Sequence, residues 1–193
     1  HEVLLPALVK YHALYPKIKF SLINLTNAQA IGAVKNQAVD FALIATPFDE
    51  DKTLKTVTIK TFQDIVVCGK RYKYLTSEKV GFEEILKHCV ISLNKTTKTY
   101  EYYFNLFRRR GLNFSPDIEV STSNQILPIV KNNLGIGFVP ESFAEKEIAD
   151  GEVFKLETEE EIAPREICLI KRKDFSLSVA AKELESVLKT IAE

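Results

Sequence analysis

The fold is decided by the stretch CVISLNKTTK, residues 89–98, in which a short apolar strand pattern runs into small polar residues at the start of an amphipathic helix. The same order occurs twice more, at Phe20-Ser21-Leu22-Ile23 before Thr26-Asn27 and at Ile118-Glu119-Val120 before Thr122-Ser123-Asn124. The start of a helix leaves about four backbone N–H groups unpaired, and these groups carry positive partial charge. Several helix starts around one crevice would bind a small, anionic molecule. The sequence therefore predicts a ligand-binding protein, and it shows no comparable constellation for bond-making chemistry.

Length and composition indicate an ordinary globular protein with room for a sizeable core. The 193 residues include 46% hydrophobic and 27% charged side chains, and 26 basic residues balance 26 acidic ones. Because the charges balance, no global field favours nucleic acid or a membrane surface. No apolar run approaches the ~18 residues that a membrane-spanning helix needs. The start at His1, with neither a Met nor a signal-peptide core, predicts a piece of a longer protein without a membrane partner.

The cysteines and glycines do not indicate a metal or a cofactor. Cys68, Cys89 and Cys168 are an odd number at wide spacing, which favours a reducing compartment, and we expect a cytoplasmic protein. His88-Cys89 has no second Cys or His at ligand spacing, and Cys89 begins an apolar strand pattern. Gly135-Ile136-Gly137 lacks the third glycine of a phosphate loop and leads into a strand, so we expect a turn and a close backbone approach there.

Alternating strand and helix patterns predict an α/β fold. Helical spacing of the apolar residues after Leu4 predicts a helix that Pro16 ends. His12 falls on the apolar stripe of this helix, where we expect a core or lobe-interface residue. A strand is expected at 18–23, a helix at 28–35 and a buried strand at 41–45, an order typical of a parallel sheet with right-handed crossovers. Further strands are expected at 56–59, 64–68, 89–92, 118–120, 136–139 and 167–170, and further helices at 82–87, 100–107, 125–131 and from 178.

These elements divide most simply into two lobes, because each portion alone gives a small sheet with few helices. We expect lobe I to comprise residues 1–62 and 168–193, and lobe II to comprise residues 63–167. Two β segments, near Thr61–Cys68 and Arg165–Ile170, would carry the chain between the lobes. The ligand would lie in the cleft between them.

Two motifs resemble the effector-binding domain of LysR-type transcriptional regulators. In the first, Leu4-Leu5-Pro6 opens a helix, Tyr15-Pro16 closes it, and QAVDFAL (residues 37–43) follows, with Val39-Asp40-Phe41-Ala42 in place of the family's usual Leu-Asp-Leu-Ala. The second is IVKNNLGIGFVPE, residues 129–141. The two motifs stand in the family's order, and the resemblance covers essentially the whole chain.

The resemblance implies a two-lobed α/β fold like that of type II periplasmic solute-binding proteins, with a small-molecule effector in the cleft. Asn27 stands where the family often has Ser or Thr, residues 94–97 correspond to the effector-contacting loop of the second lobe, and Thr122 and Ser123 match polar residues before the next helix. The predicted effector contacts are Thr26, Asn27, Asn94, Thr96, Thr97, Thr122 and Ser123. The alternative for each is a helix cap worth about 1 kcal/mol with no ligand at all. Either Lys95 or Lys98 could complement a carboxylate, or both could be solvated.

The sequence departs from the family in three places. Gln37 and Asn133 stand where the family usually has Gly. Asn tolerates left-handed backbone geometry, whereas Gln has no such tolerance, and this puts the shape of the turn at Gln37 in question. The family also has a strand before Leu4-Leu5-Pro6, which this sequence lacks, so the sheet of lobe I is expected to have an unfilled position or to borrow a strand.

The resemblance also implies partners. Domains of this family pair through the first helix and an adjoining strand, here Val3–Tyr15 and Lys19–Ile23, which predicts a homodimer or tetramer. DNA would be bound only through a helix-turn-helix domain that this sequence does not contain. The alternatives are an extracytoplasmic solute-binding protein of a transporter and an enzyme on the same scaffold. An enzyme would need a catalytic group in the cleft, and the nearest candidate, Asp40, is expected to be structural instead.

Overall fold

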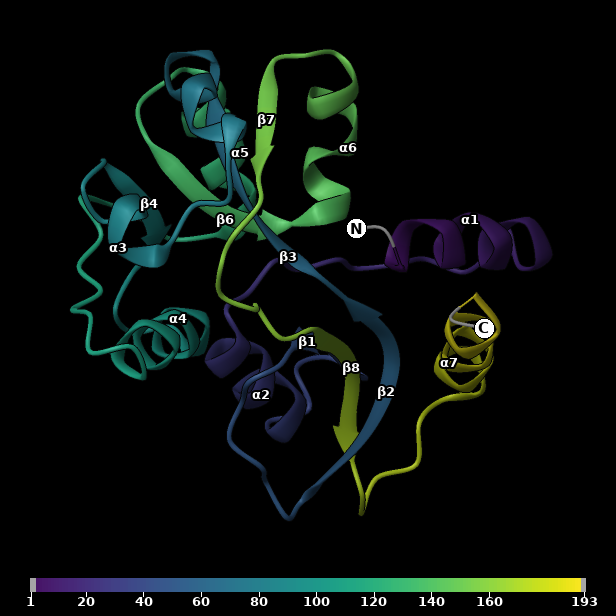
Figure 1. Ribbon diagram of the computed structural model, residues 1–193. Helices are drawn as coiled ribbons and strands as arrows, with labels where there is room; N and C mark the ends of the chain where they lie inside the picture. Colours follow the sequence, from purple (N-terminus) through teal and green to yellow (C-terminus); the bar gives the residue numbers. More distant parts are fainter. Residues whose placement is uncertain (1–2, 192–193) are drawn as a thin grey trace. The chain divides into compact units, whose positions relative to one another are not determined.

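The computed structural model describes residues 3–191, which form two compact units (Figure 1). Unit 1 comprises His1–Thr61 and Glu166–Glu193, and unit 2 comprises Phe62–Arg165. The chain therefore passes between the units twice, from Thr61 to Phe62 and from Arg165 to Glu166.

Unit 1 is built on a three-stranded sheet in the order β1-β8-β2. Strands β1 and β8 are antiparallel, with Ala42 opposite Ile170. Successive residues of a strand point to opposite faces, so Leu169 packs in a core with α1 and α7 while Ile170 packs in a core with α2. The elements are α1 (Leu4–Leu14), α2 (Asn27–Lys35), β1 (Ala42–Ala45), β2 (Leu54–Phe62), β8 (Arg165–Arg172) and α7 (Val179–Ile191).

The strand expected at 18–23 is wrong. These residues form neither helix nor strand, and no strand of the described sheet pairs with them. Leu22 and Ile23 are 58% and 57% exposed, so the alternating pattern has no sheet to pack on. An extended segment becomes a strand only when a neighbour satisfies its backbone groups. His12 is exposed, so it is not the core residue that was one of its two expected roles.

Unit 2 holds a five-stranded sheet in the order β5-β4-β6-β3-β7. Strand β4 is parallel to both β5 and β6, whereas β3 is antiparallel to β6 and β7. The sheet is thus mixed, with its parallel half at the β5 edge. The elements are β3 (Asp64–Gly69), the 3₁₀ helix η1 (Lys70–Ser77), α3 (Phe82–Ile85), β4 (Val90–Leu93), α4 (Lys98–Arg108), β5 (Ile118–Val120), the 3₁₀ helix η2 (Ser123–Gln125), α5 (Ile126–Lys131), β6 (Ile136–Pro140), α6 (Glu141–Ala149) and β7 (Val153–Leu156).

Aromatic side chains fill the core between the sheet of unit 2 and α4. Phe107 stacks on Phe82 with ring centroids 4.4 Å apart, and it also contacts Phe114 and Phe138. On the opposite face, Ile91 packs with residues of α5 in a second core. Both faces of β4 are therefore buried, as its continuous apolar pattern predicts.

Gln37 and Asn133, which stand where the family usually has Gly, share one backbone geometry. Gln37 has φ +58° and Asn133 has φ +63°, both in the left-handed region that favours glycine. The side chain of Asn133 also makes a structural contact, because its Oδ1 accepts a hydrogen bond from the backbone N–H of Arg71 at 2.8 Å. At Gly135 a Cβ would collide with the carbonyl oxygen of Cys89, which confirms the predicted close approach.

Candidate ligand-binding site

The first predicted cluster lies at the start of α2 in unit 1. Thr26 is the N-cap: its Oγ1 accepts from Gln29 N at 3.4 Å, and Gln29 Oε1 accepts from Thr26 N at 3.0 Å. This capping box satisfies two of the N–H groups at the helix start. Asn27 donates through Nδ2 to Ala45 O at 2.7 Å, so its side chain ties the helix start to the end of β1.

The second cluster lies between β4 and α4 in unit 2. Thr97 is the N-cap of α4, with its Oγ1 accepting from Tyr100 N at 3.1 Å and donating to Asn94 O at 2.9 Å. Asn94 Oδ1 accepts from the N–H of Thr96 at 3.1 Å and from its hydroxyl at 2.5 Å. The loop is therefore held by its own side chains, and the N-terminus of an 11-residue helix directly follows it.

The third cluster lies just after β5, next to the second. Leu93 pairs with Val120 in the parallel β4–β5 ladder, and Asn94 N donates to Val120 O at 3.0 Å. The carboxyl ends of both strands thus meet at one edge of the sheet. Thr122 donates to Asn124 Oδ1 at 2.5 Å and caps the short helix η2, which begins with the half-buried Ser123. The structure brings the second and third clusters together within unit 2, whereas Thr26 and Asn27 belong to unit 1.

A buried hydroxyl next to the second cluster could not be singled out from the sequence. Ser92 is 2% exposed, and its Oγ has no hydrogen-bond partner among the described residues. A buried hydroxyl without a partner costs about 1–3 kcal/mol, so such a group is a candidate to bind a water or a ligand. The available signal was the single polar residue in the otherwise apolar strand β4, two residues before Asn94.

The charges around the second cluster are largely paired. Lys95 lies 3.7 Å from Glu119, and Lys98 lies 2.9 Å from Glu101. Both lysines therefore have carboxylate neighbours. The positive charge offered at this edge comes mainly from the backbone N–H groups of the first turn of α4.

The remaining candidates from the sequence are His88, Cys89 and Asp40. His88 Nε2 lies 3.4 Å from Glu84, and burial, followed by the Asp117 carboxylate, raises the pKa of the Cys89 thiol. Among the described residues, no cluster of three or more His, Cys, Asp or Glu side chains is suited to hold a metal. Asp40 is exposed, lies two residues before β1 and lines a 230 Å³ pocket in unit 1, and its predicted structural role stays a prediction.

The chain belongs to the family described as the LysR substrate binding domain, because the model of this family matches residues 1–192. The chain is 24% identical to YoaU, an uncharacterized HTH-type transcriptional regulator of Bacillus subtilis (strain 168). That alignment covers 96% of this chain but only 61% of YoaU, so the chain spans less than two thirds of this relative.

Solved structures show the same fold. The effector-binding domain of QuiR in complex with shikimate has a TM-score of 0.83 at 16% identity, covering 97% of this chain and 88% of that one. The CcmR regulatory domain of Synechocystis PCC6803 in complex with 2-PG has a TM-score of 0.83 at 17% identity, covering 97% and 90%. The OxyR2 regulatory domain of Vibrio vulnificus in its reduced form has a TM-score of 0.78 at 15% identity, covering 98% and 88%. The predicted α/β fold of the periplasmic-binding-protein type is confirmed.

One further property concerns membranes. Within residues 3–191, no helix has the length and apolar character required to cross a bilayer.

Proposed function

We propose that this chain is the effector-sensing domain of a transcriptional regulator and that it binds a small, anionic molecule between two lobes. Lobe I would comprise residues 1–62 and 168–193, and lobe II residues 63–167. The observation that carries the proposal is the shared edge of β4 and β5, where hydroxyl and amide side chains surround the N-terminus of α4. A helix N-terminus with polar side chains around it suits a carboxylate or phosphate.

The effector contacts in this proposal are those predicted from the sequence. Lobe II would contribute Asn94, Thr96, Thr97, Thr122 and Ser123, and lobe I would contribute Thr26 and Asn27. Membership of the LysR substrate-binding family supports these contacts. Two structurally similar domains, solved in complex with shikimate and with 2-PG, support them as well.

The effector would alter the grip on DNA of a helix-turn-helix segment elsewhere in the protein, and the protein would work in the cytoplasm. The HTH-type relative YoaU supports this part of the proposal, because its length extends well beyond the region matched by this chain. Ligand and DNA would then be coupled through a shift between two conformations of the regulator.

Calorimetry against a panel of small acids tests the effector proposal. The panel contains shikimate, 2-phosphoglycolate, and common carboxylic and amino acids. For a binder from this panel, we expect Ser123→Ala and Thr96→Val each to weaken affinity about tenfold, the loss of one hydrogen bond to a charged group. Thr76→Val is the matched control, because Thr76 lies in η1 and its hydroxyl donates to Lys73 O at 2.8 Å. A panel without any binder, or equal losses in the control, would contradict the proposal.

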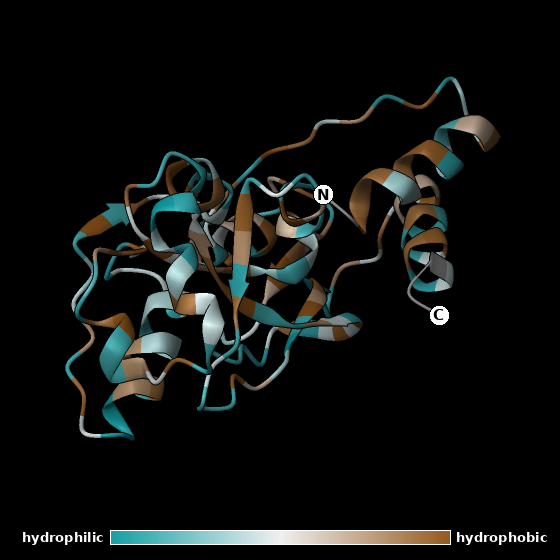
Figure 2. Ribbon diagram, turned by 45° about the horizontal axis from the view of Figure 1, so that its top comes forward, coloured by the Kyte–Doolittle hydropathy of each residue, from teal (hydrophilic) through white to brown (hydrophobic). Residues whose placement is uncertain are grey.

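We also propose that the chain forms a homodimer or tetramer through Val3–Tyr15 and Lys19–Ile23. Helix α1 buries Ala7 and Tyr11 but leaves Val9 73% exposed and Leu14 61% exposed. Hydrophobic residues run along α1 and the segment that follows it (Figure 2). Exposed apolar side chains gathered on one element favour a protein partner. Residues 19–23 pair with no described strand, so their backbone would offer a strand position to that partner.

A further inference from the structure

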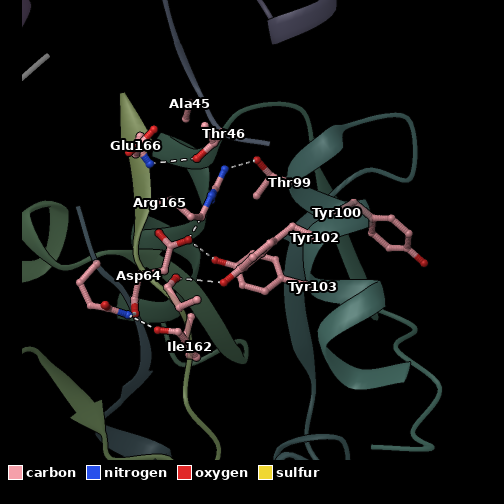
Figure 3. Close-up of polar contacts among 12 residues, drawn as sticks. Ala45, Thr46, Asp64, Thr99, Tyr100, Tyr102, Tyr103, Ile162, Arg165 and Glu166 are labelled. Atoms are coloured by element: carbon pink, nitrogen blue, oxygen red, sulfur yellow. Dashed lines mark hydrogen bonds and ion pairs between the residues drawn. The ribbon is translucent and has the colours of Figure 1, made fainter. Parts of the chain in front are cut away.

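A buried ion pair stands at the two points where the chain enters and leaves unit 2. Arg165 Nη1 lies 2.8 Å from Asp64 Oδ2, and the two residues are only 5% and 2% exposed. Asp64 begins β3, two residues after the first passage between the units, and Arg165 is the last residue before the second passage. The pair therefore joins two segments that are 101 residues apart in the sequence (Figure 3).

Helix α4 contacts this ion pair through one face. Thr99 Oγ1 accepts from Arg165 Nη2 at 2.9 Å, and the Tyr103 hydroxyl donates to Asp64 Oδ2 at 2.6 Å. The Tyr102 hydroxyl donates to Ala163 O at 3.0 Å, just before Arg165. Residues three and four positions apart lie on the same side of a helix, so a single face of α4 holds both chain segments.

Aromatic rings complete the enclosure of the guanidinium group. Its central carbon lies 5.3 Å from the ring centroid of Phe62 and 5.3 Å from that of Tyr102. Burial, followed by the neighbouring Asp64 carboxylate, raises the pKa of Tyr103 well above its ordinary value, so the hydroxyl stays a donor at neutral pH. We call Asp64, Thr99, Tyr102, Tyr103 and Arg165 the crossover clamp.

The ion pair at the centre of the crossover clamp suits a positioning role better than a stabilising one. A buried ion pair is a poor source of stability, because desolvation offsets most of its Coulomb energy, and its best attested use is to fix one particular geometry. Here the fixed geometry connects α4 to both passages of the chain between the units. The first turn of α4, which supplies Thr99, directly follows Thr97 in the predicted effector loop.

We propose that the crossover clamp is a positioning device that makes residues 62–66 and 163–165 follow α4 as one body. A movement of the N-terminal turn of α4 then displaces both segments, 62–66 and 163–165, together. The second half of this inference, in which an effector causes the shift, rests on the proposed function. The first half concerns the chain without any ligand and stands by itself.

Hydrogen–deuterium exchange on the unliganded chain tests the first half. Thr99→Val removes the acceptor for Arg165 on α4 and keeps the side-chain volume, and Tyr103→Phe removes only the hydroxyl bond to Asp64. We expect each variant to raise amide exchange about three- to tenfold in both 62–66 and 163–165, as the loss of one buried hydrogen bond implies. Tyr100→Phe is the matched control on the same helix, because the Tyr100 hydroxyl donates to Phe114 O at 3.3 Å, and Phe114 belongs to neither segment. Unchanged exchange in either segment, or an equal rise in the control, would overturn the proposal.

Hydrogen–deuterium exchange with a ligand present tests the second half. With shikimate or 2-phosphoglycolate added, protection of residues 94–97 in the wild-type chain should be accompanied by protection of 62–66 and 163–165, and Thr99→Val should uncouple the two. Protection of 94–97 alone overturns the coupling. If neither acid protects 94–97, the result counts against the proposed effector loop, and the unliganded comparison still decides the clamp.

Discussion

At the scale of single residues, the strained backbone at Gln37 leads to a direct prediction. The left-handed region costs a residue with a side chain roughly 1–2 kcal/mol, and it does not cost Gly this amount. Gln37 has φ +58° and an exposed side chain. Gln37→Gly should therefore raise the free energy of unfolding by about 1 kcal/mol, after the greater entropy of Gly in the unfolded chain is deducted. Urea denaturation of the two chains measures the difference.

Asn133 provides the contrasting variant. Its φ of +63° is nearly the same, but Asn tolerates this region and its side chain accepts the hydrogen bond from Arg71 N. Asn133→Gly should therefore fail to stabilise the chain. A gain equal to that of Gln37→Gly would show that backbone strain is not the cause.

Residue roles could be predicted only where they depend on local sequence. The polar residues before α2 and α4 are predicted from the sequence to be either caps or ligand contacts, and Thr26 and Thr97 do cap these helices. Their contact with an effector stays a prediction. The role of Arg165 had no local signal, because its partner Asp64 is 101 positions away and only the fold brings them together.

At the scale of elements, periodicity predicted the helices well and the strands less well. A helix satisfies its own backbone, so the apolar stripe of α4 was sufficient to predict it. A strand depends on a neighbour, and the alternation at 18–23 could not reveal that no described strand pairs with it. The four-residue strand β7 and helix α6 were not predicted either, because their apolar patterns are short.

A buried carboxylate, that of Glu185, links helix α7 to the sheet of unit 1. We expect its ionisation to change the free energy of unfolding. Glu185 is 5% exposed and lies 2.5 Å from Lys171 of β8 and 2.8 Å from Lys189 of its own helix. Burial by itself raises the pKa of Glu185, but the hydrogen bonds and charges of Lys171 and Lys189 outweigh it and lower the pKa below the ordinary 4.5. A lowered native pKa means that this stabilisation is present above pH 4.5 and is lost as the pH falls through the native value.

Glu185→Gln should therefore cost about 2 kcal/mol of unfolding free energy at pH 7, a typical value for hydrogen bonds to a charged group. The difference between wild type and variant should shrink as the pH is lowered below 4.5, because the wild-type carboxylate is then protonated as well. Denaturant titrations across this pH range provide the measurement. Glu183→Gln, at an exposed site on the same helix, is the control and should change stability little at any pH. A Glu185→Gln deficit that stays constant down to pH 2, about 2.5 pH units below the ordinary pKa of 4.5, would contradict this role for the carboxylate.

At the scale of the whole molecule, family resemblance predicted more than periodicity did. Patterns alone suggested two small α/β portions, and the motifs at 37–43 and 129–141 led to the periplasmic-binding-protein type of fold that the comparisons confirm. The predicted parallel sheet is wrong for β1, which is antiparallel to β8, and the sheet of unit 2 is mixed. The antiparallel contacts of β1 with β8 and of β3 with β6 join segments far apart in the sequence, so local patterns could not reveal them.

The proposed association of two copies can be tested by placing a charge on α1. Val9 is 73% exposed in the single chain, so Val9→Asp should leave folding intact, yet burying an unpaired carboxylate in an interface through Val3–Tyr15 should weaken association at least about tenfold. Sedimentation equilibrium measures the dissociation constant of both chains. Leu134→Asp is the matched control, since Leu134 is a 55% exposed apolar residue of unit 2, and it should leave association unchanged. An exposed apolar helix face favours association, because burying it against a partner removes apolar surface from water. A wild-type chain that stays strictly monomeric in light scattering at high concentration would therefore refute the interface.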